Sequence, residues 1–204
     1  MDTIETTAVA AAVPASPDAL AKAQAQAPPG AGVLDTLAVE RLSPAGQLDA
    51  VVAWERLVRH AHAGLIRALG ALAAGAGNER WLAESEVCAA LAWSSATAQN
   101  RLGEADALTR LFPETLQQLA EGRVSVEQAR SLAHLTAGLD DQAAQAVQER
   151  VLARMPGQSA AVTRQAIRRA IQRADPQAAA QRHRYERARR RVDLRPEDDG
   201  MATL

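Results

Sequence analysis

The stretch ESEVCAALAWSSATAQNRLGEADAL, residues 84–108, contains two apolar patterns of helical period separated by a short break. Val87 and Leu91 lie four residues apart and would share one face of a first helix. After residues 92–93, Ser94 and Ser95 offer hydroxyls that can cap a second helix. The expected inward positions of that second helix are Ala98, Leu102 and Ala105. A helix, a tight turn and a capped helix form the helix-turn-helix arrangement, whose second helix can enter a DNA major groove.

The outward positions at the start of this second helix carry polar side chains suited to recognising bases. Amides of Gln and Asn can form paired hydrogen bonds with adenine, and the guanidinium of Arg can do so with guanine. The candidate DNA-binding residues here are Ser95, Thr97, Gln99, Asn100 and Arg101.

Structural packing is the alternative interpretation of the same stretch. Two amphipathic helices joined by a serine-capped turn also occur in bundles that bind no DNA. Residues 84–111 hold four acidic side chains against two arginines, Arg101 and Arg110. Because DNA affinity comes largely from cations that replace phosphate counterions, this acidic excess counts against DNA contact. Both interpretations stay open at this point.

The composition favours an almost wholly helical protein. Hydrophobic residues make up 48% of the 204 residues but aromatic residues only 2%, and alanine, the best helix former, is abundant. We therefore expect a mostly α fold, a multi-helix bundle with helix-turn-helix-like units. The single cysteine, Cys88, excludes an internal disulfide and a cysteine-cluster metal site.

Upstream, the pattern predicts a helix over residues 33–42 and a long helix over residues 44–74. Ser43 followed by Pro44 is a typical cap and first helical residue. The long helix would be the spine of the bundle, with an inward apolar row of Leu48, Val51, Val52, Leu57, Val58, Leu65, Leu69 and Leu72.

Downstream, three more helix starts are visible. Ser125 and Gln128 form a capping box after a short helix that stops at Gly122, which gives a second helix-turn-helix-like unit. Asp140 and Ser159 can cap the next two helices. Their inward residues would be Ala143, Val147, Val151 and Leu152, and then Val162, Ala166, Ile167, Ala170 and Ile171.

The two ends of the chain differ from this helical part in composition and in the pattern of apolar residues. Residues 1–33 are rich in Ala, Pro and Gln, and we expect them to form a disordered leader. Residues 192–204 alternate apolar and polar side chains around Asp199-Gly200, which predicts the start of a β-hairpin. The expected organisation is a leader over 1–33, a helical domain over 34–191 and a hairpin start over 192–204, where the sequence would end inside a domain.

The net charge of −1 hides a strong asymmetry. Residues 1–149 hold 10 Lys or Arg against 18 Asp or Glu, whereas residues 150–195 hold 13 Arg against 3 acids. Such a split suggests either a nucleic-acid partner or contact between the acidic and basic halves, within one copy or between copies. The candidate phosphate-binding arginines are Arg164, Arg168, Arg169, Arg173, Arg187 and Arg190.

With these residues in view, the chain resembles the actinobacterial 13E12 repeat family, domain of unknown function 222, the region found N-terminal to HNH endonuclease domains. Five segments carry the resemblance: residues 40–56, 86–108, 115–130, 155–176 and 199–204. The resemblance implies a mostly helical accessory region of a DNA-cleaving or mobile-element protein. It does not imply an activity of the region itself.

The sequence departs from such endonucleases in its histidines. Only His60, His62, His134 and His183 are present, and none stands in an HNH-like context. We therefore expect no catalytic residue, no metal site, no cofactor and no enzymatic activity in this chain.

The N-terminus carries Asp2 and Glu5 where a secretory signal would be basic, so we expect a cytoplasmic protein without membrane contact. The hypotheses are a DNA-binding or DNA-positioning module and, as the alternative, a structural or oligomerisation module with no nucleic-acid contact.

Overall fold

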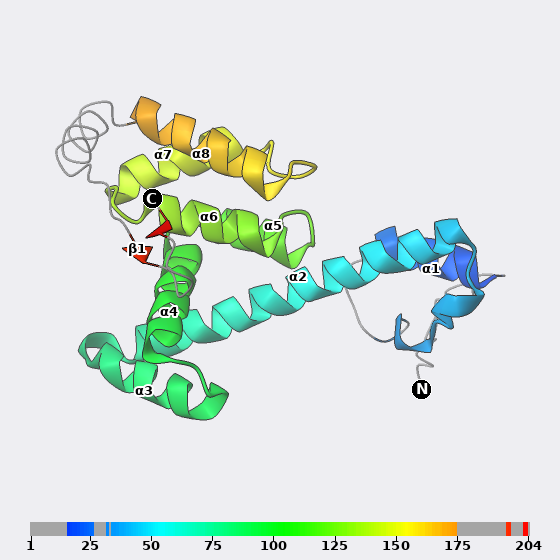
Figure 1. The fold of residues 1–204 in the computed structure, drawn as a ribbon, viewed down its shortest axis with the longest axis horizontal. Coiled ribbons are helices and arrows are strands. Elements are labelled where there is room, and N and C mark those ends of the chain that lie inside the picture. Colours follow the sequence, from blue (N-terminus) through cyan, green and yellow to red (C-terminus); the bar gives the residue numbers. More distant parts are fainter. Residues whose placement is uncertain (1–15, 27–31, 33, 175–194, 197–201, 204) are drawn as a thin grey trace, which may run out of the picture.

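The computed structural model describes residues 16–26, 32, 34–174, 195–196 and 202–203, and the described part is almost entirely helical (Figure 1). The mostly α prediction is confirmed. The α-helices are α1 (Pro17–Gln26), α2 (Pro44–Gly75), α3 (Arg80–Leu91), α4 (Ser95–Arg110), α5 (Pro113–Ala120), α6 (Val126–Thr136), α7 (Asp141–Leu152) and α8 (Ala160–Ala174). Three short 3₁₀ helices are η1 (Leu34–Thr36), η2 (Val39–Arg41) and η3 (Gly77–Glu79).

A short antiparallel pair lies where the sequence predicts the start of a hairpin. β1 (Arg195–Pro196) pairs with β2 (Ala202–Thr203), with Arg195 opposite Thr203. The turn that would join them lies outside the described residues.

Helix α2 is the spine of the molecule, as the sequence predicted. Its 32 residues span about 48 Å at 1.5 Å per residue, and Figure 1 shows it running between two separate groups of elements. The hydroxyl of Ser43 accepts a hydrogen bond from the Gly46 amide at 3.2 Å and begins the helix. Helices α3–α8 gather with its C-terminal half around one large apolar core. A small second cluster, Ala21, Leu42 and Ala50, joins its N-terminal half to α1.

Helix α1 corrects the prediction of a disordered leader for residues 17–26. Ala21 is fully buried against α2, and the Asp18 carboxylate accepts a hydrogen bond from the Ser43 amide at 3.0 Å. The sequence suggested disorder because this stretch has few large apolar residues, but alanine can pack closely against another helix. Apart from Ser16 and Gly32, the remainder of the leader lies outside the described residues. Residues 33–42 also differ from prediction, since η1 and η2 replace a single helix there.

The inward face of α2 is another correction. Of the predicted apolar row only Leu69 is buried, and Leu57 is half-buried; the other six are exposed. The buried positions are instead small residues and one isoleucine: Gly46, Ala50, Ala53, Ala63, Ile66, Gly70 and Ala73. Small side chains occupy these positions because neighbouring helices approach closely. At Gly70, for example, a Cβ atom would lie 2.7 Å from the Thr109 hydroxyl.

Three α2 side chains anchor the turn between α5 and α6. His60 Nδ1 donates to the Ala120 carbonyl at 2.8 Å, Arg56 to that of Glu121 at 3.2 Å, and Arg59 to that of Gly122 at 3.0 Å. The last carbonyls of a helix have no partner within the helix, so these bonds cap α5. Gly122 has φ of +73°, and a Cβ there would lie 2.9 Å from Arg56, so the turn requires glycine.

The predicted helix pair α3–α4 is present, with one correction. Ala92 adopts a left-handed conformation, φ 52°, and Ser94 caps α4 by accepting from the Thr97 amide at 3.2 Å. Val87, Ala98 and Leu102 are buried as predicted, but Leu91 is 45% exposed. Leu91 is the last residue of α3, where the chain already turns away toward α4.

The caps of the later helices are confirmed. Ser125 and Gln128 form the capping box of α6, and Asp140 and Ser159 accept hydrogen bonds from Ala143 and Val162. Val147, Val151, Leu152, Ile167 and Ala170 are buried as predicted, whereas Ala143, Ala166 and Ile171 are only half-buried and Val162 is exposed.

A pair of leucine substitutions tests the placement of α3 and α4. Leu102→Ala should lower the free energy of unfolding by about 2–5 kcal/mol because it leaves a cavity beneath a side chain that is 1% exposed. Leu91→Ala, the matched control, should cost less than about 1 kcal/mol. Urea denaturation followed by circular dichroism measures both. Equal losses would contradict the placement.

Candidate nucleic-acid interface

The first residues of α4 are divided between stabilising the turn and facing outward. The Ser95 hydroxyl donates to the Glu84 carboxylate of α3, and the Thr97 hydroxyl lies 2.9 Å from that of Ser94. Ser95 therefore links α4 to α3, whereas Thr97 stabilises the first turn of α4. They are exposed, but their hydroxyls are already engaged.

Gln99 and Asn100 are the candidate base-contacting residues that remain free. Both are exposed, and neither side-chain amide has a hydrogen-bond partner within the part of the chain that the structure describes. They line a hollow of about 520 Å³ between α4 and the end of α6, whose lining includes Phe112 and His134. Their amides can therefore donate and accept at the mouth of a surface hollow.

Arg101 is held by an ion pair. Its guanidinium donates to Glu104 Oε2 at 3.2 Å, and Arg130 Nε of α6 lies 3.3 Å from the same oxygen. The Arg130 contact is an ion pair without hydrogen-bond geometry, since that nitrogen has no hydrogen-bond partner. Glu104 thus bridges α4 and α6 and keeps both arginines from facing solvent freely.

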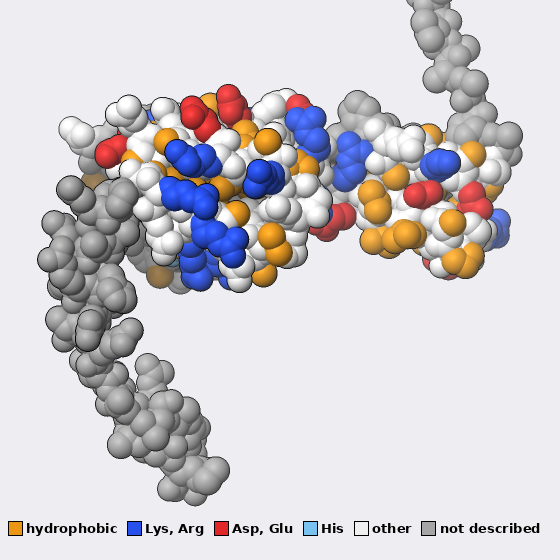
Figure 2. Space-filling model, turned by 90° about the horizontal axis from the view of Figure 1, so that it is seen from above, with side chains coloured by type: hydrophobic (Ala, Val, Ile, Leu, Met, Phe, Trp, Pro, Cys, Tyr) orange, Lys and Arg blue, Asp and Glu red, His pale blue; other side chains and the backbone are white. Residues whose placement is uncertain are grey.

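Helix α8 presents an outward basic face, as the sequence predicted. Arg164, Arg168, Arg169 and Arg173 are all exposed, and the helix contains no acidic residue. None of the four forms an ion pair with an acid of the described residues. Viewed from the α8 side, basic side chains gather on this surface (Figure 2). Arg187 and Arg190 lie outside the described residues.

The structure connects the two sets of candidates through α6. A second hollow of about 410 Å³ is lined by Arg164, Arg168 and Arg130, and it shares Glu104 and His134 with the first hollow. We call this continuous surface the α4–α6–α8 groove. It brings Gln99 and Asn100 into one surface with Arg164 and Arg168, although more than sixty residues separate them in the chain.

The charge of the groove changes along its length. The hollow beside Gln99 contains Glu104, Asp106 and Asp141 against Arg110, whereas the hollow beside α8 contains three arginines against Glu104 and Glu127. Arg110 donates to Asp141 Oδ2 at 2.7 Å, and this hydrogen bond together with the Asp141 charge raises the pKa of Arg110. Free cations are therefore concentrated at the α8 end.

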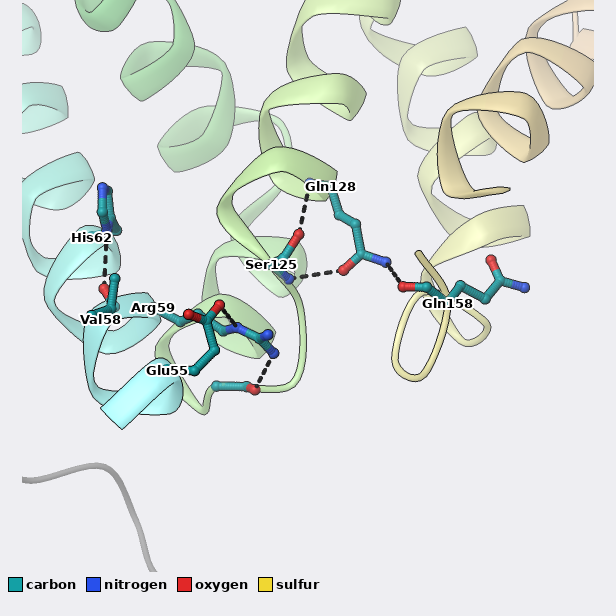
Figure 3. A network of polar contacts seen from close by, with 8 residues as sticks. Glu55, Val58, Arg59, His62, Ser125, Gln128 and Gln158 are labelled. Atoms are coloured by element: carbon teal, nitrogen blue, oxygen red, sulfur yellow. Dashed lines mark hydrogen bonds and ion pairs between the residues drawn. The ribbon is translucent and has the colours of Figure 1, made fainter. Parts of the chain in front are cut away.

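One buried amide determines where α8 lies. Gln128 is 3% exposed, and its Nε2 contacts the carbonyls of Met155 and Gln158 at 2.8 and 3.0 Å and the Thr163 hydroxyl at 2.8 Å. Its Oε1 accepts from the Ser125 amide at 2.8 Å (Figure 3). The capping box was visible in the sequence; the long-range bonds, and the roles of Glu104, Arg130 and His134 in the groove, had no sequence signal because they depend on tertiary contacts.

Two further features of the described residues bear on function. No group of three or more His, Cys, Asp or Glu side chains is placed to hold a metal ion there. Within the same residues, no helix combines the length and apolar character needed to cross a bilayer.

These features define an all-helical domain built on helix-turn-helix-like pairs, with a basic helix beside a polar hollow. The chain belongs to the family described as domain of unknown function (DUF222), whose model matches residues 47–204. No curated protein and no solved structure matches it.

Substituting Gln128 tests how α8 is held. Gln128→Leu should lower the free energy of unfolding by at least about 1–3 kcal/mol, because it removes the buried hydrogen bonds to the Met155 carbonyl and the Thr163 hydroxyl. The exposed Gln165→Leu on α8 is the control and should change it by no more than about 0.5 kcal/mol. Hydrogen exchange should show faster exchange in α8 than in α4 for the first variant only. Uniform exchange across both helices would contradict this role.

Proposed function

We propose that this chain is a DNA-binding or DNA-positioning helical region of an HNH-endonuclease-like protein, and that it contacts duplex DNA across the α4–α6–α8 groove. The observation that carries the proposal is the exposed arginine face of α8, which has no acidic partner among the described residues and adjoins the free amides of Gln99 and Asn100. The relation to HNH endonucleases rests on the resemblance to the 13E12 repeat family. We assign the chain no catalytic step of its own.

The groove suggests a division of labour between its two ends. Arginines without acidic partners gain most from releasing phosphate counterions, so the α8 end would supply affinity. Amides at the mouth of the α4 hollow can form paired hydrogen bonds with base edges, so that end would supply sequence preference. The acids around the α4 hollow disfavour phosphates there and are compatible with this division.

A second candidate function is a structural or oligomerisation module without nucleic-acid contact. It is favoured by the exposed valine and leucine side chains along α2, six of which are at least 36% exposed: Leu48, Val51, Val52, Val58, Leu65 and Leu72. Docking of the basic residues on the chain's own acidic residues receives less support, since the α8 arginines pair with none of the described acids. Absence of duplex DNA binding even at about 20 mM salt would favour this candidate over the first.

Four arginine substitutions test the α8 end. Replacing Arg164, Arg168, Arg169 and Arg173 with Ala should weaken binding to all duplex sequences alike and reduce the salt dependence of log K by up to about 3–4. Fluorescence anisotropy over a salt series measures this. The control variant removes the same charge elsewhere, by Ala at Lys22, Arg41, Arg67 and Arg80, which are all exposed. Equal weakening by both variants would show that only total charge matters.

The α4 end is tested in the same assay by comparing the affinities for different DNA sequences. Replacing Gln99 and Asn100 with Ala should reduce discrimination between sequences, by about 1–3 kcal/mol per paired contact, and leave the salt dependence unchanged. Uniform weakening on every sequence would contradict the proposed division of labour.

Glu104 gives a test in the opposite direction. Glu104→Gln removes a negative charge shared by both hollows and releases Arg101 and Arg130, so DNA affinity at low salt should rise about threefold or more. Glu79→Gln, an exposed acid on η3, serves as control and should change affinity little. No gain from Glu104→Gln would place the DNA contact elsewhere.

A further inference from the structure

Helix α2 has one continuous apolar face that no other described element covers. We call this face the α2 seam; it consists of Val51, Trp54, Val58, Ala61, Leu65, Ala68 and Leu72. These residues are alternately three and four positions apart, and all of them are exposed, with Val51 at 62% and Leu65 at 41%. Single exposed apolar residues are ordinary on protein surfaces, but a contiguous row of seven marks an interaction surface.

The seam points away from the body of the molecule at the middle of α2. Arg56, Arg59 and His60 are committed to the carbonyls of the α5–α6 turn. Residues two apart on a helix differ by about 200° in direction, so Trp54 and Val58 lie opposite Arg56 and His60 respectively. The core therefore uses the other side of the helix, and the seam is left for a different partner.

The seam residues themselves carry no charge. None of them is ionisable, and one neighbouring row, Ala50, Leu57, Gly64 and Ala71, is likewise apolar and mostly small. The other neighbouring row contains His62 and Glu55, and Glu55 is paired with Arg59. Two identical surfaces brought together repel wherever they carry like charges, and the seam residues have none to repel. The small residues beside the seam also allow a second helix to approach closely.

The spacing identifies the kind of partner. An apolar repeat of alternating three and four residues is the heptad pattern of coiled coils, in which each side chain fits between four side chains of a facing helix. The facing helix must match in length, and among the described helices the next longest, α4, has 16 residues and buries its apolar positions in the core. A helix of matching length and repeat is α2 itself. We propose that the α2 seam pairs with the α2 seam of a second copy of this chain.

The side-chain sizes specify an antiparallel pair. In a parallel pair each position faces its own copy, so Leu65 would meet Leu65 and Ala68 would meet Ala68, which gives crowded and empty layers in turn. In an antiparallel pair the two sets of heptad positions face each other, so Val58 and Leu65 meet alanines of the second copy, such as Ala61. Even layers are the better packed.

The arrangement of the molecule agrees with this direction. Helices α3–α8 lie beside the C-terminal half of α2, while α1 lies along its N-terminal part (Figure 1). Antiparallel pairing places the two large bodies at opposite ends, where they do not collide. Near the N-terminal end, Val51, Trp54 and Val58 line a hollow of about 300 Å³ together with Val39, Ala50 and Glu55, and it is open to receive side chains of the second copy.

Two valines of α2 provide the decisive comparison. Val58 on the seam is 46% exposed and Val52 off the seam is 41% exposed, so Val58→Glu and Val52→Glu are matched in residue type, helix and exposure. Sedimentation equilibrium of the full chain from about 1 to 100 µM covers the dissociation of modest interfaces. The unmodified chain and Val52→Glu should form dimers, and Val58→Glu should weaken dimerisation at least about tenfold. Leu65→Glu should repeat that loss, and circular dichroism should show unchanged helix content.

A chain that stays monomeric at about 100 µM would overturn the proposal. Equal effects of Val58→Glu and Val52→Glu would overturn it as well. Neither result depends on DNA, so this inference and the proposed function fail separately.

Cross-linking tests the direction in a Cys88→Ala background. With a short bifunctional maleimide, Leu72→Cys alone should give no linked dimer, whereas a mixture of Val51→Cys and Leu72→Cys should give one. Self-linking of Leu72→Cys would mean that the helices run parallel and would overturn the antiparallel pairing.

Discussion

The rest of the structure depends on the hydrogen bonds between α2 and the carbonyls at the end of α5 and in the turn that follows. His60 satisfies the last carbonyl of α5, and Arg56 and Arg59 satisfy those of the next two residues, all from one side of α2. These bonds fix the rotation of α2 about its own axis. They therefore decide that alanines and glycines face the core and that Val58 and Leu65 face outward. A rotation of α2 toward its larger apolar residues would strand these three carbonyls.

A second polar interaction sets the position of the basic helix. The amide of Gln128 holds the α7–α8 connection from α6, and with it the side of the molecule to which α8 points its arginines. Glu104 connects α4 and α6 in a similar way, because its carboxylate accepts a hydrogen bond from Arg101 and forms an ion pair with Arg130. The α4–α6–α8 groove is thus assembled by two side chains that would not themselves be expected to touch DNA. Its geometry is only as rigid as these buried and half-buried polar contacts.

The two proposed surfaces differ in their physical basis. The groove would act through cations and free amides, and its strength would fall as salt rises. The α2 seam would act through apolar burial and would depend little on salt. They also occupy different elements, since no seam residue lines either hollow of the groove. DNA contact and self-association can therefore coexist in one molecule.

The sequence by itself determined where most helices begin, because a cap joins residues only three apart. Ser43, Ser94, Asp140, Ser159 and the Ser125–Gln128 box were all identified correctly. The outward arginines of α8 were equally local. Only the tertiary structure decided which face of α2 is buried and that Leu91 is exposed. It also decided that α1 packs against α2 and that Gln99 shares a surface with Arg164. Each depends on close approach between helices distant in sequence, where an alanine or glycine can be preferred to a leucine because it allows the neighbouring backbone to come nearer.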